Sequence, residues 1–115
     1  MTFEMPFPPA LNRYYRTVNG RPILSRDGRA YRTNAQAALQ EQRVAGVPGK
    51  VACHISAHQP DRRRRDLDGM LKAALDALES NGVIENDADI DHLTITRASV
   101  DKTNPRLVIT VEPLL

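Results

Sequence analysis

One stretch near the middle of the chain limits its fold more than any other, because a strand pattern is followed closely by a helix pattern. Residues 51–58 alternate between apolar and polar side chains, which predicts a half-buried strand. Residues 67–80 carry apolar side chains at the i, i+3, i+4 and i+7 spacing, which predicts an amphipathic helix. This stripe consists of Leu67, Met70, Leu71, Ala74, Leu75 and Leu78. Each element has one apolar face to bury, so we expect them to pack together in a mixed α/β core.

Four further elements complete an expected order of strand, helix, strand, helix, strand, strand. Their ranges are Thr2–Met5, Ala30–Val44, Leu93–Ser99 and Leu107–Glu112, of which the second is the helix. A turn at residues 101–105 makes the last two strands an expected antiparallel pair. We therefore expect one domain over residues 1–115 of the α/β (α+β) class, with a mixed β-sheet and two packed helices.

The segment between the first strand and the first helix is basic and contains two turn dipeptides. Asn19-Gly20 and Asp27-Gly28 predict a loop or a hairpin there. Such a segment can hold phosphates through arginines and stack a base on a tyrosine, which makes Arg13, Tyr14 and Arg16 candidate DNA-binding residues. The alternative is a polar surface loop whose tyrosines pack into the core.

Charge is distributed unevenly along the chain. Residues 1–65 hold 12 Lys/Arg and 4 Asp/Glu, whereas residues 66–115 hold 4 Lys/Arg and 10 Asp/Glu. A basic half joined to an acidic half suits a protein that binds a polyanion and also concentrates carboxylates. Chance clustering on a solvated surface is the alternative reading.

Other features bear on the cellular compartment. Cys53 is the only cysteine, which excludes an internal disulfide and favours a reducing, cytoplasmic setting. No apolar run approaches the ~20 residues that a membrane span needs. Residues 1–10 lack the basic and long apolar segments of a signal peptide, so we expect no membrane partner.

The densest chemical signal is the charged run at residues 61–68. It contains four consecutive arginines, Arg62, Arg63, Arg64 and Arg65, between a strand end and a helix start. Arginine forks match phosphate geometry, although a solvated charged loop would have the same composition. Asp66 stands where an N-cap is expected, but capping does not also explain Asp68. Asp68 and Lys72 have the i, i+4 spacing of a helical ion pair, which is the structural alternative to catalysis.

A third cluster places Asp87, Asp89 and Asp91 at alternate positions. In an extended segment these three side chains would project on one side. The spacing also opens a calcium EF-hand loop, but His92 stands at its sixth position and Ala98 at its twelfth, which excludes that motif. An acidic turn without a ligand is the alternative.

Together these residues favour a magnesium site, with Mn²⁺ as a substitute ion, over any other metal. Carboxylate oxygens with retained waters suit Mg²⁺, and one or two such ions supply an activated water and charge neutralisation for phosphodiester hydrolysis. A nearby lysine can stabilise developing charge. The three histidines, His54, His58 and His92, lack the spacing of a zinc site.

These motifs resemble the RusA family of Holliday junction resolvases. The resemblance rests on residues 61–68, Lys72 and residues 73–78, on residues 6–9 with residues 12–16, and on the Asn86-Asp87-Ala88 turn before a strand. It implies a homodimer from a bacterium or a phage, working in the cytoplasm on four-way DNA junctions, with Mg²⁺-dependent paired nicking. It also implies that Asp66, Asp68 and Asp87 are the catalytic, metal-binding aspartates and that Lys72 is the catalytic lysine.

The sequence departs from this family at two positions and leaves two alternatives open. Gly69 stands where the family commonly has Asn, and Asn86 stands where an acid is often found. The first alternative is a branched-DNA-binding module of the same fold that is catalytically weak or inactive. The second is a small interaction protein whose acidic patch binds a basic partner.

Overall fold

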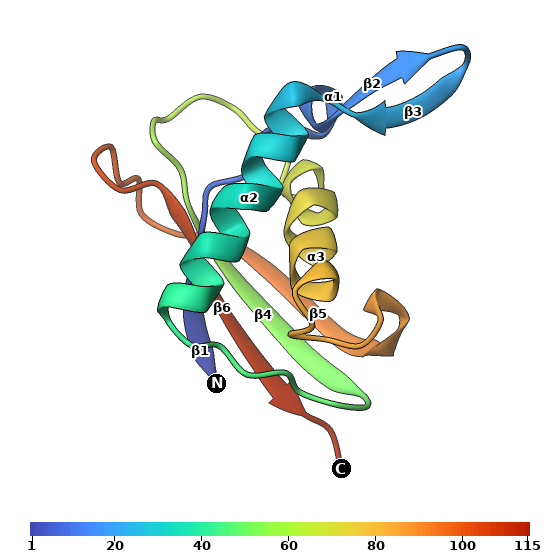
Figure 1. Cartoon of the computed structure of the whole chain (residues 1–115). Helices are drawn as coiled ribbons and strands as arrows, with labels where there is room; N and C mark the ends of the chain where they lie inside the picture. The colour runs from blue at the N-terminus through green and yellow to red at the C-terminus, as the bar shows by residue number, and fades with distance from the viewer.

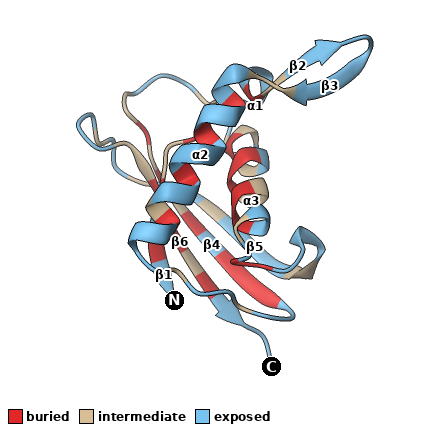
Figure 2. Cartoon of the chain, viewed as in Figure 1, coloured by how far each residue is buried: buried red, intermediate tan, exposed pale blue.

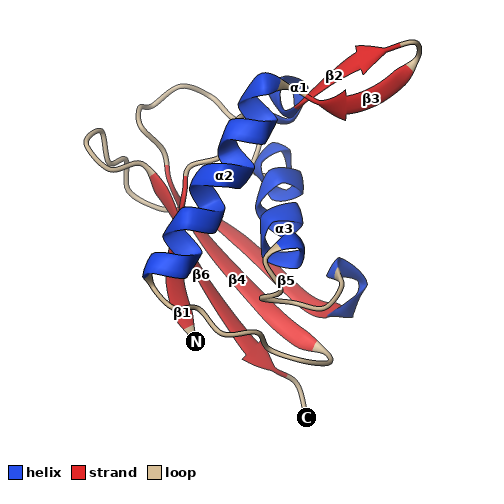
Figure 3. Ribbon diagram, viewed as in Figure 1, coloured by secondary structure: helices blue, strands red, loops and turns tan.

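A four-stranded sheet forms one layer of the molecule, and two helices cover one of its faces (Figure 1). The computed structural model describes all residues from 1 to 115. The strands of this sheet lie in the order β1-β6-β4-β5. Their bounds are Thr2–Pro6 for β1, Val51–His58 for β4, Ile90–Arg97 for β5 and Arg106–Pro113 for β6. The covering helices are α2, Arg26–Glu41, and α3, Leu71–Ser80, and the mixed α/β prediction is therefore confirmed (Figure 3).

The central strand β4 has two different neighbours. It runs parallel to β5, with Ala57 opposite Arg97, and antiparallel to β6, with His58 opposite Arg106. The expected antiparallel pairing of the last two strands is therefore wrong, because β4 lies between them. The connection over residues 98–105 crosses the end of β4, and the most apolar strand thereby gains a partner on both of its edges.

The helix α2 begins earlier than its periodicity indicates. Ser25 caps it, since its hydroxyl oxygen accepts from the backbone N–H of Gly28 at 2.9 Å. Asp27 and Gly28 therefore form the first helical turn instead of a loop turn. A Cβ atom on Gly28 would lie 2.4 Å from the backbone oxygen of Tyr14, so the close approach of these two segments requires glycine.

The start of α3 also differs from the expectation. A 3₁₀ turn over Asp68–Met70 precedes the helix, and no side chain caps either element. Asp66 is thus not an N-cap residue; only its backbone oxygen takes part, accepting from the N–H of Gly69 at 3.2 Å. The carboxylate of Asp66 therefore caps neither the 3₁₀ turn nor the helix.

A β-hairpin projects from the body of the molecule (Figure 1). The short helix α1, Leu11–Tyr14, leads directly into β2, Tyr15–Val18, which pairs antiparallel with β3, Arg21–Leu24. Positive φ angles of 52° at Asn19 and 75° at Gly20 make the tight turn, as the sequence predicts. Most hairpin residues are exposed, as Figure 2 shows.

The hydrophobic core lies between the sheet and the two helices (Figure 2). Val51, Cys53, Ile55 and Ala57 of β4 face it and are buried, in agreement with the predicted alternation. Leu78 from α3 and Leu39 from α2 complete the helical side of the core. None of the helices is long and apolar enough to cross a membrane.

Candidate functional site

The arginine run lies in the loop that leaves β4 and leads to α3, and Asp61 folds the start of this loop. Its carboxylate accepts from the backbone N–H of Arg63 at 2.9 Å and from the Arg65 guanidinium at 2.7 Å. The hydrogen bond from Arg65, followed by the one from Arg63, lowers the pKa of Asp61 from 3.8 to about 2. Asp61 thus shapes the loop and is not available as a metal ligand.

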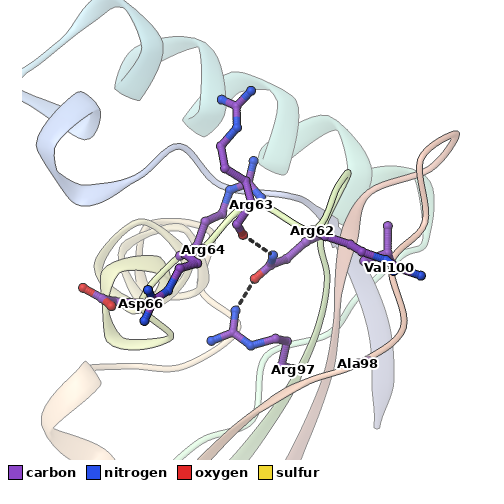
Figure 4. A pocket seen from close by; sticks show the side chains of 9 residues that line it. Arg62, Arg63, Arg64, Asp66, Arg97, Ala98 and Val100 are labelled. Atoms are coloured by element: carbon purple, nitrogen blue, oxygen red, sulfur yellow. Dashed lines mark hydrogen bonds between the residues drawn. The ribbon is translucent and has the colours of Figure 1, made fainter.

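Gln59 fastens this loop to the neighbouring strand β5. Its side chain is only 3% exposed, its amide nitrogen donates to the backbone oxygen of Arg63 at 3.2 Å, and its amide oxygen accepts from Arg97. Arg97 is thereby added to the arginines of the loop. Arg97 and the four loop arginines line a hollow of about 440 Å³, and Asp66 lines it as well. Figure 4 shows the loop arginines fanning out around these hydrogen bonds, with Arg64 directed toward Asp66.

Asp66 and Asp68 open onto an adjoining hollow of about 510 Å³. Arg64, Arg65 and Phe7 also line this hollow, and the Arg65 guanidinium lies over the Phe7 ring, 5.6 Å from its centre. Both aspartates are exposed, and neither carboxylate has a hydrogen-bond or ion-pair partner within the chain. The structure therefore brings these two candidate ligands to one hollow.

Asp87 lies elsewhere. It begins the 3₁₀ turn η2, Asp87–Asp89, and its backbone N–H donates to the carboxylate of Glu79 in the last turn of α3 at 2.9 Å. Asp68 lies just before the first turn of the same helix, and ten helical residues span about 15 Å. One chain therefore does not bring Asp87 together with Asp66 and Asp68.

The segment after Asp87 also differs from the sequence expectation. The η2 turn replaces the extended geometry that would align three alternate aspartates. Asp89 and Asp91 instead lie 3.9 Å and 3.8 Å from the ammonium of Lys50. These two acids form a local ion pair with a lysine, and they are not part of the hollow beside Asp66.

The donor set beside α3 suits magnesium in its chemistry. Asp66 and Asp68 offer hard carboxylate oxygens with no competing partner, and Mg²⁺ commonly binds one or two carboxylates together with waters and substrate phosphates. No group of three or more His, Cys, Asp or Glu side chains within one chain is close enough to hold a metal ion. The two aspartates are thus the residues that fit such an ion, and substrate oxygens or a further carboxylate would have to complete its coordination.

Lys72 pairs with Asp76, and the ion pair with Asp68, the structural alternative to catalysis, is not formed. The Lys72 ammonium lies 3.0 Å from Oδ1 of Asp76, which is the next i, i+4 position along α3. The hydrogen bond to Asp76 raises the pKa of Lys72 above its ordinary value. The direction of the pairing follows from the geometry at residues 68–70, where Asp68 lies in a 3₁₀ turn outside the regular helix.

Asp76 is itself the centre of a polar cluster that the sequence did not indicate. Its Oδ2 atom accepts from the hydroxyls of Tyr14 at 3.2 Å and Tyr15 at 3.5 Å, and Nη2 of Arg32 lies 3.7 Å away. The Asp76 side chain is 13% exposed. The available signal was an acid inside the apolar run from Leu71 to Leu78, where a charged residue needs partners.

The candidate DNA-binding residues of the N-terminal segment separate into two groups. Tyr14 is 0% exposed, so its ring packs into the core and cannot stack on a base, which corrects the expectation for that residue. Arg13 lines a hollow of about 590 Å³ with Arg63, Arg64 and Arg65. Arg16 lies on the exposed hairpin.

One face of the hairpin combines arginines with aliphatic side chains. Arg16 pairs with Ile23 and Val18 with Arg21, and residues paired across antiparallel strands share a face. Val18 and Ile23 are 39% and 37% exposed. The hairpin therefore presents a basic, partly apolar surface to solvent.

Arg97 is a further basic residue that sequence reasoning missed. It is the only Lys or Arg between Lys72 and Lys102, in the acidic half of the chain. That isolation was the available signal. Only the parallel pairing of β5 with β4 brings it beside Gln59 and the arginine run, and periodicity alone does not reveal strand neighbours.

Comparison with known proteins gives consistent matches over nearly the whole chain. Residues 6–112 match the family model described as endodeoxyribonuclease RusA. The chain is 40% identical to the crossover junction endodeoxyribonuclease RusA of Escherichia coli (strain K12) over 111 residues, covering 96% of this chain and 92% of the relative. The protein of the same name from Shigella sonnei (strain Ss046) gives the same values. The corresponding protein of Enterobacteria phage 82 is 39% identical over 93% of this chain and 89% of the relative.

Proposed function

The chain belongs to the RusA endodeoxyribonuclease family, and on that basis we propose that it is a crossover junction endodeoxyribonuclease. It cuts four-way DNA junctions by symmetric, paired hydrolysis of phosphodiester bonds. The observation that carries this proposal is the pair of free carboxylates, Asp66 and Asp68, in a hollow walled by arginines of the same loop. Anionic DNA is drawn to the arginines, and the carboxylates provide the ligands that hydrolysis of its backbone needs. The enzyme works in the cytoplasm of a bacterial cell, at the nucleoid.

Asp66 and Asp68 are the residues that would hold Mg²⁺, for which Mn²⁺ can substitute. A bound Mg²⁺ at these residues would supply an activated water and neutralise charge at the scissile phosphate. Arg64 and Arg65 line the same hollow and bind the phosphates that flank the cut. Their forks hold the DNA backbone in register beside the two carboxylates.

Lys72 lies one helical turn beyond Asp68, and its side chain is 46% exposed. Its ammonium stabilises the negative charge that develops as the phosphodiester bond breaks. A lysine is protonated at cellular pH, and the pairing with Asp76 raises the pKa of Lys72 further above its ordinary value. The lysine therefore contributes a fixed positive charge at the ordinary pH of a cell.

A wider basic surface surrounds the carboxylates. Arg97 and the loop arginines from Arg62 to Arg65 line one hollow, Arg13 lines another with Arg63, Arg64 and Arg65, and Arg16 lies on the exposed hairpin. Contacts from the loop and from the hairpin would together hold more than one duplex arm of a branched substrate. These residues bind phosphates, so they set the affinity for DNA and its salt dependence. Phosphate contacts carry no sequence information, so any sequence preference has to come from contacts with the bases.

The position of Asp87 favours a dimer. Asp66 and Asp68 precede α3 and Asp87 follows it, so a third carboxylate for the same metal must come from another copy of the chain. We therefore propose a two-fold homodimer in which Asp87 of the partner subunit completes each site. Two sites related by a two-fold axis also match the two cuts that a four-way junction needs.

A nicking assay on a synthetic four-way junction, with and without Mg²⁺, tests the proposed function. We expect paired nicks only with the ion, and Asp68→Asn protein that still binds the junction but no longer cuts it. Junction binding by the unmodified chain with no cleavage in Mg²⁺ or Mn²⁺ would instead identify an inactive branched-DNA-binding module. The absence of any junction affinity would favour a protein-interaction role for the acidic half.

A further inference from the structure

We propose that Asp76 is a positioning residue that holds Lys72 in place for the cleavage step. The inference rests on the proposed function, because it assigns Asp76 a role through the candidate catalytic lysine. Asp76 does not line the hollow beside Asp66 and Asp68. It acts through the Lys72 ammonium, and the division of partners between its two oxygens carries the argument.

The two carboxylate oxygens of Asp76 have different tasks. Oδ2 accepts hydrogen bonds from Tyr14 and Tyr15 at the root of the hairpin, and Nη2 of Arg32 on α2 lies 3.7 Å away as an ion-pair partner. Oδ1 is contacted by Lys72 alone, at 3.0 Å. The first oxygen therefore fixes the carboxylate, and the second is left to orient the lysine.

The anchoring side of this cluster is built into the packed part of the molecule. Tyr14 is fully buried, and its hydroxyl also accepts a hydrogen bond from Nε of Arg32 at 3.3 Å. The backbone oxygen of Tyr14 is held at the start of α2 by the close approach of Gly28. A carboxylate fixed in this way has little freedom to follow a mobile lysine, so the lysine is held by the carboxylate.

The charge balance of the cluster leaves Lys72 useful for catalysis. Two cations, Arg32 and Lys72, share the single negative charge of Asp76, so the group keeps a net positive charge. Their side chains are 43% and 46% exposed, while Asp76 is 13% exposed. The positive charge is thus directed toward solvent, where a phosphate can approach, and the negative charge lies beneath it.

A purely structural ion pair would not need this arrangement. Two tyrosine hydrogen bonds and the ion pair with Arg32 already stabilise the largely buried carboxylate, so a solvent-exposed lysine adds little stability to it. A long, flexible lysine side chain held in one orientation is pre-organised for an electrostatic contact in the transition state. Loss of this orientation should slow cleavage without weakening DNA binding.

A double-mutant cycle tests the proposal through single-turnover nicking rates, junction affinity and thermal melting. Asp76→Asn keeps the shape of the side chain, and we expect it to slow nicking by about tenfold to a hundredfold, because misplacing a catalytic group costs that much. The junction Kd should not change. In a Lys72→Ala background, Asp76→Asn should cause no further loss, because the residue through which it acts is gone.

The matched control is Glu4→Gln, which removes the carboxylate of another ion pair. Glu4 lies 3.2 Å from Nε of Arg106, in β1 and outside the cluster. We expect this variant to nick at the rate of the unmodified protein. If Asp76→Asn lowers the melting temperature too far for comparison, Tyr14→Phe removes one anchor and keeps the charge. We expect Tyr14→Phe to slow nicking less than Asp76→Asn does, and to cause no further loss of rate in the Lys72→Ala background.

A second measurement needs neither DNA nor metal, so it separates this proposal from the proposed function. The chain has three lysines, Lys50, Lys72 and Lys102, so NMR of the lysine ammonium groups gives few signals to assign. We expect Asp76→Asn to shift the Lys72 signal and speed its hydrogen exchange, while Lys50 and Lys102 stay unchanged. An unchanged Lys72 signal, or equal rate losses in both backgrounds of the cycle, would overturn the positioning role. Wild-type nicking by Lys72→Ala protein would overturn the catalytic role of the lysine instead.

Discussion

Asp68 and Asp87 lie at opposite ends of α3, although both are candidate ligands of one metal ion. A helix of ten residues does not bend back on itself, so the distance between them is built into the fold. A second copy of the chain can bring an Asp87 to each Asp68 without changing either fold. The arrangement can be tested by mixing two inactive proteins.

Asp68→Asn and Asp87→Asn chains should each be inactive as homodimers, because each lacks one carboxylate at both sites. A mixed dimer should regain one working site, which pairs the intact Asp68 of one chain with the intact Asp87 of the other. Mixing the two proteins after partial unfolding should therefore restore single nicks but not paired cuts. Gel analysis of nicked junctions measures this, and a mixture as inactive as its components would show that each site is complete within one chain.

Arg97 should contribute a phosphate contact at the far side of the arginine run. Arg97→Ala should weaken junction binding and flatten the dependence of log Kd on log salt by about 0.9, the value for one duplex phosphate contact. Titrations at several salt concentrations measure the slope. Lys102→Ala, which changes an exposed lysine outside the arginine run, is the control and should leave the slope unchanged. An unchanged slope in Arg97→Ala would exclude Arg97 from the DNA surface.

Lys72→Ala distinguishes catalysis from ion pairing at that position. Loss of a preorganised electrostatic contact costs about 10²–10³ in rate, whereas an exposed ion pair contributes only about 0–1 kcal/mol to stability. We expect a large loss of nicking with nearly unchanged melting temperature and junction affinity. Lys72→Arg should restore the rate only in part, since the guanidinium differs in shape and reach. Full activity in the alanine protein, measured in single-turnover experiments, would leave Lys72 with the ion-pair role alone.

Asp61 predicts a specific pH dependence of stability. Hydrogen bonds from Arg65 and Arg63 lower its folded-state pKa from 3.8 to about 2, so the unfolded chain binds a proton more readily than the folded chain between these values. The stabilisation is present above pH 4 and is lost as the pH falls toward 2. Between pH 4 and pH 2, the melting temperature of the Asp61→Asn protein should therefore fall by less than that of the unmodified protein. Thermal melts at a series of pH values check this, and parallel curves for the two proteins would contradict it.

The elements set by local sequence were largely predictable. The strand over residues 51–58 has the predicted bounds, and the hairpin turn at Asn19-Gly20 forms as expected. Both depend on side-chain alternation or on the φ angles of two residues. The order of strands in the sheet was not predictable in this way, because a strand pattern does not say which edge its neighbour occupies.

The residues of the candidate site were likewise predictable where they are close in sequence and not where their partners are distant. Asp66, Asp68, Arg64 and Arg65 are close in sequence, and all four line one hollow in the structure. Asp76 and Gln59 were missed because their partners are distant: Tyr14 is 62 residues from Asp76, and Arg97 is 38 residues from Gln59. The separation of Asp87 from the other two acids within one chain was not predicted, because the family resemblance assigned all three aspartates to one metal site without indicating which chain supplies each.

The length of α3 also has a consequence at the scale of the cell. On the proposed assignment, no isolated chain contains a full set of three carboxylates, because the helix keeps Asp87 away from the other two. At low expression most chains are single, and by mass action the number of complete sites rises with the square of the chain concentration. On that assignment, the rate of cutting would follow the amount of assembled dimer and not the total number of chains.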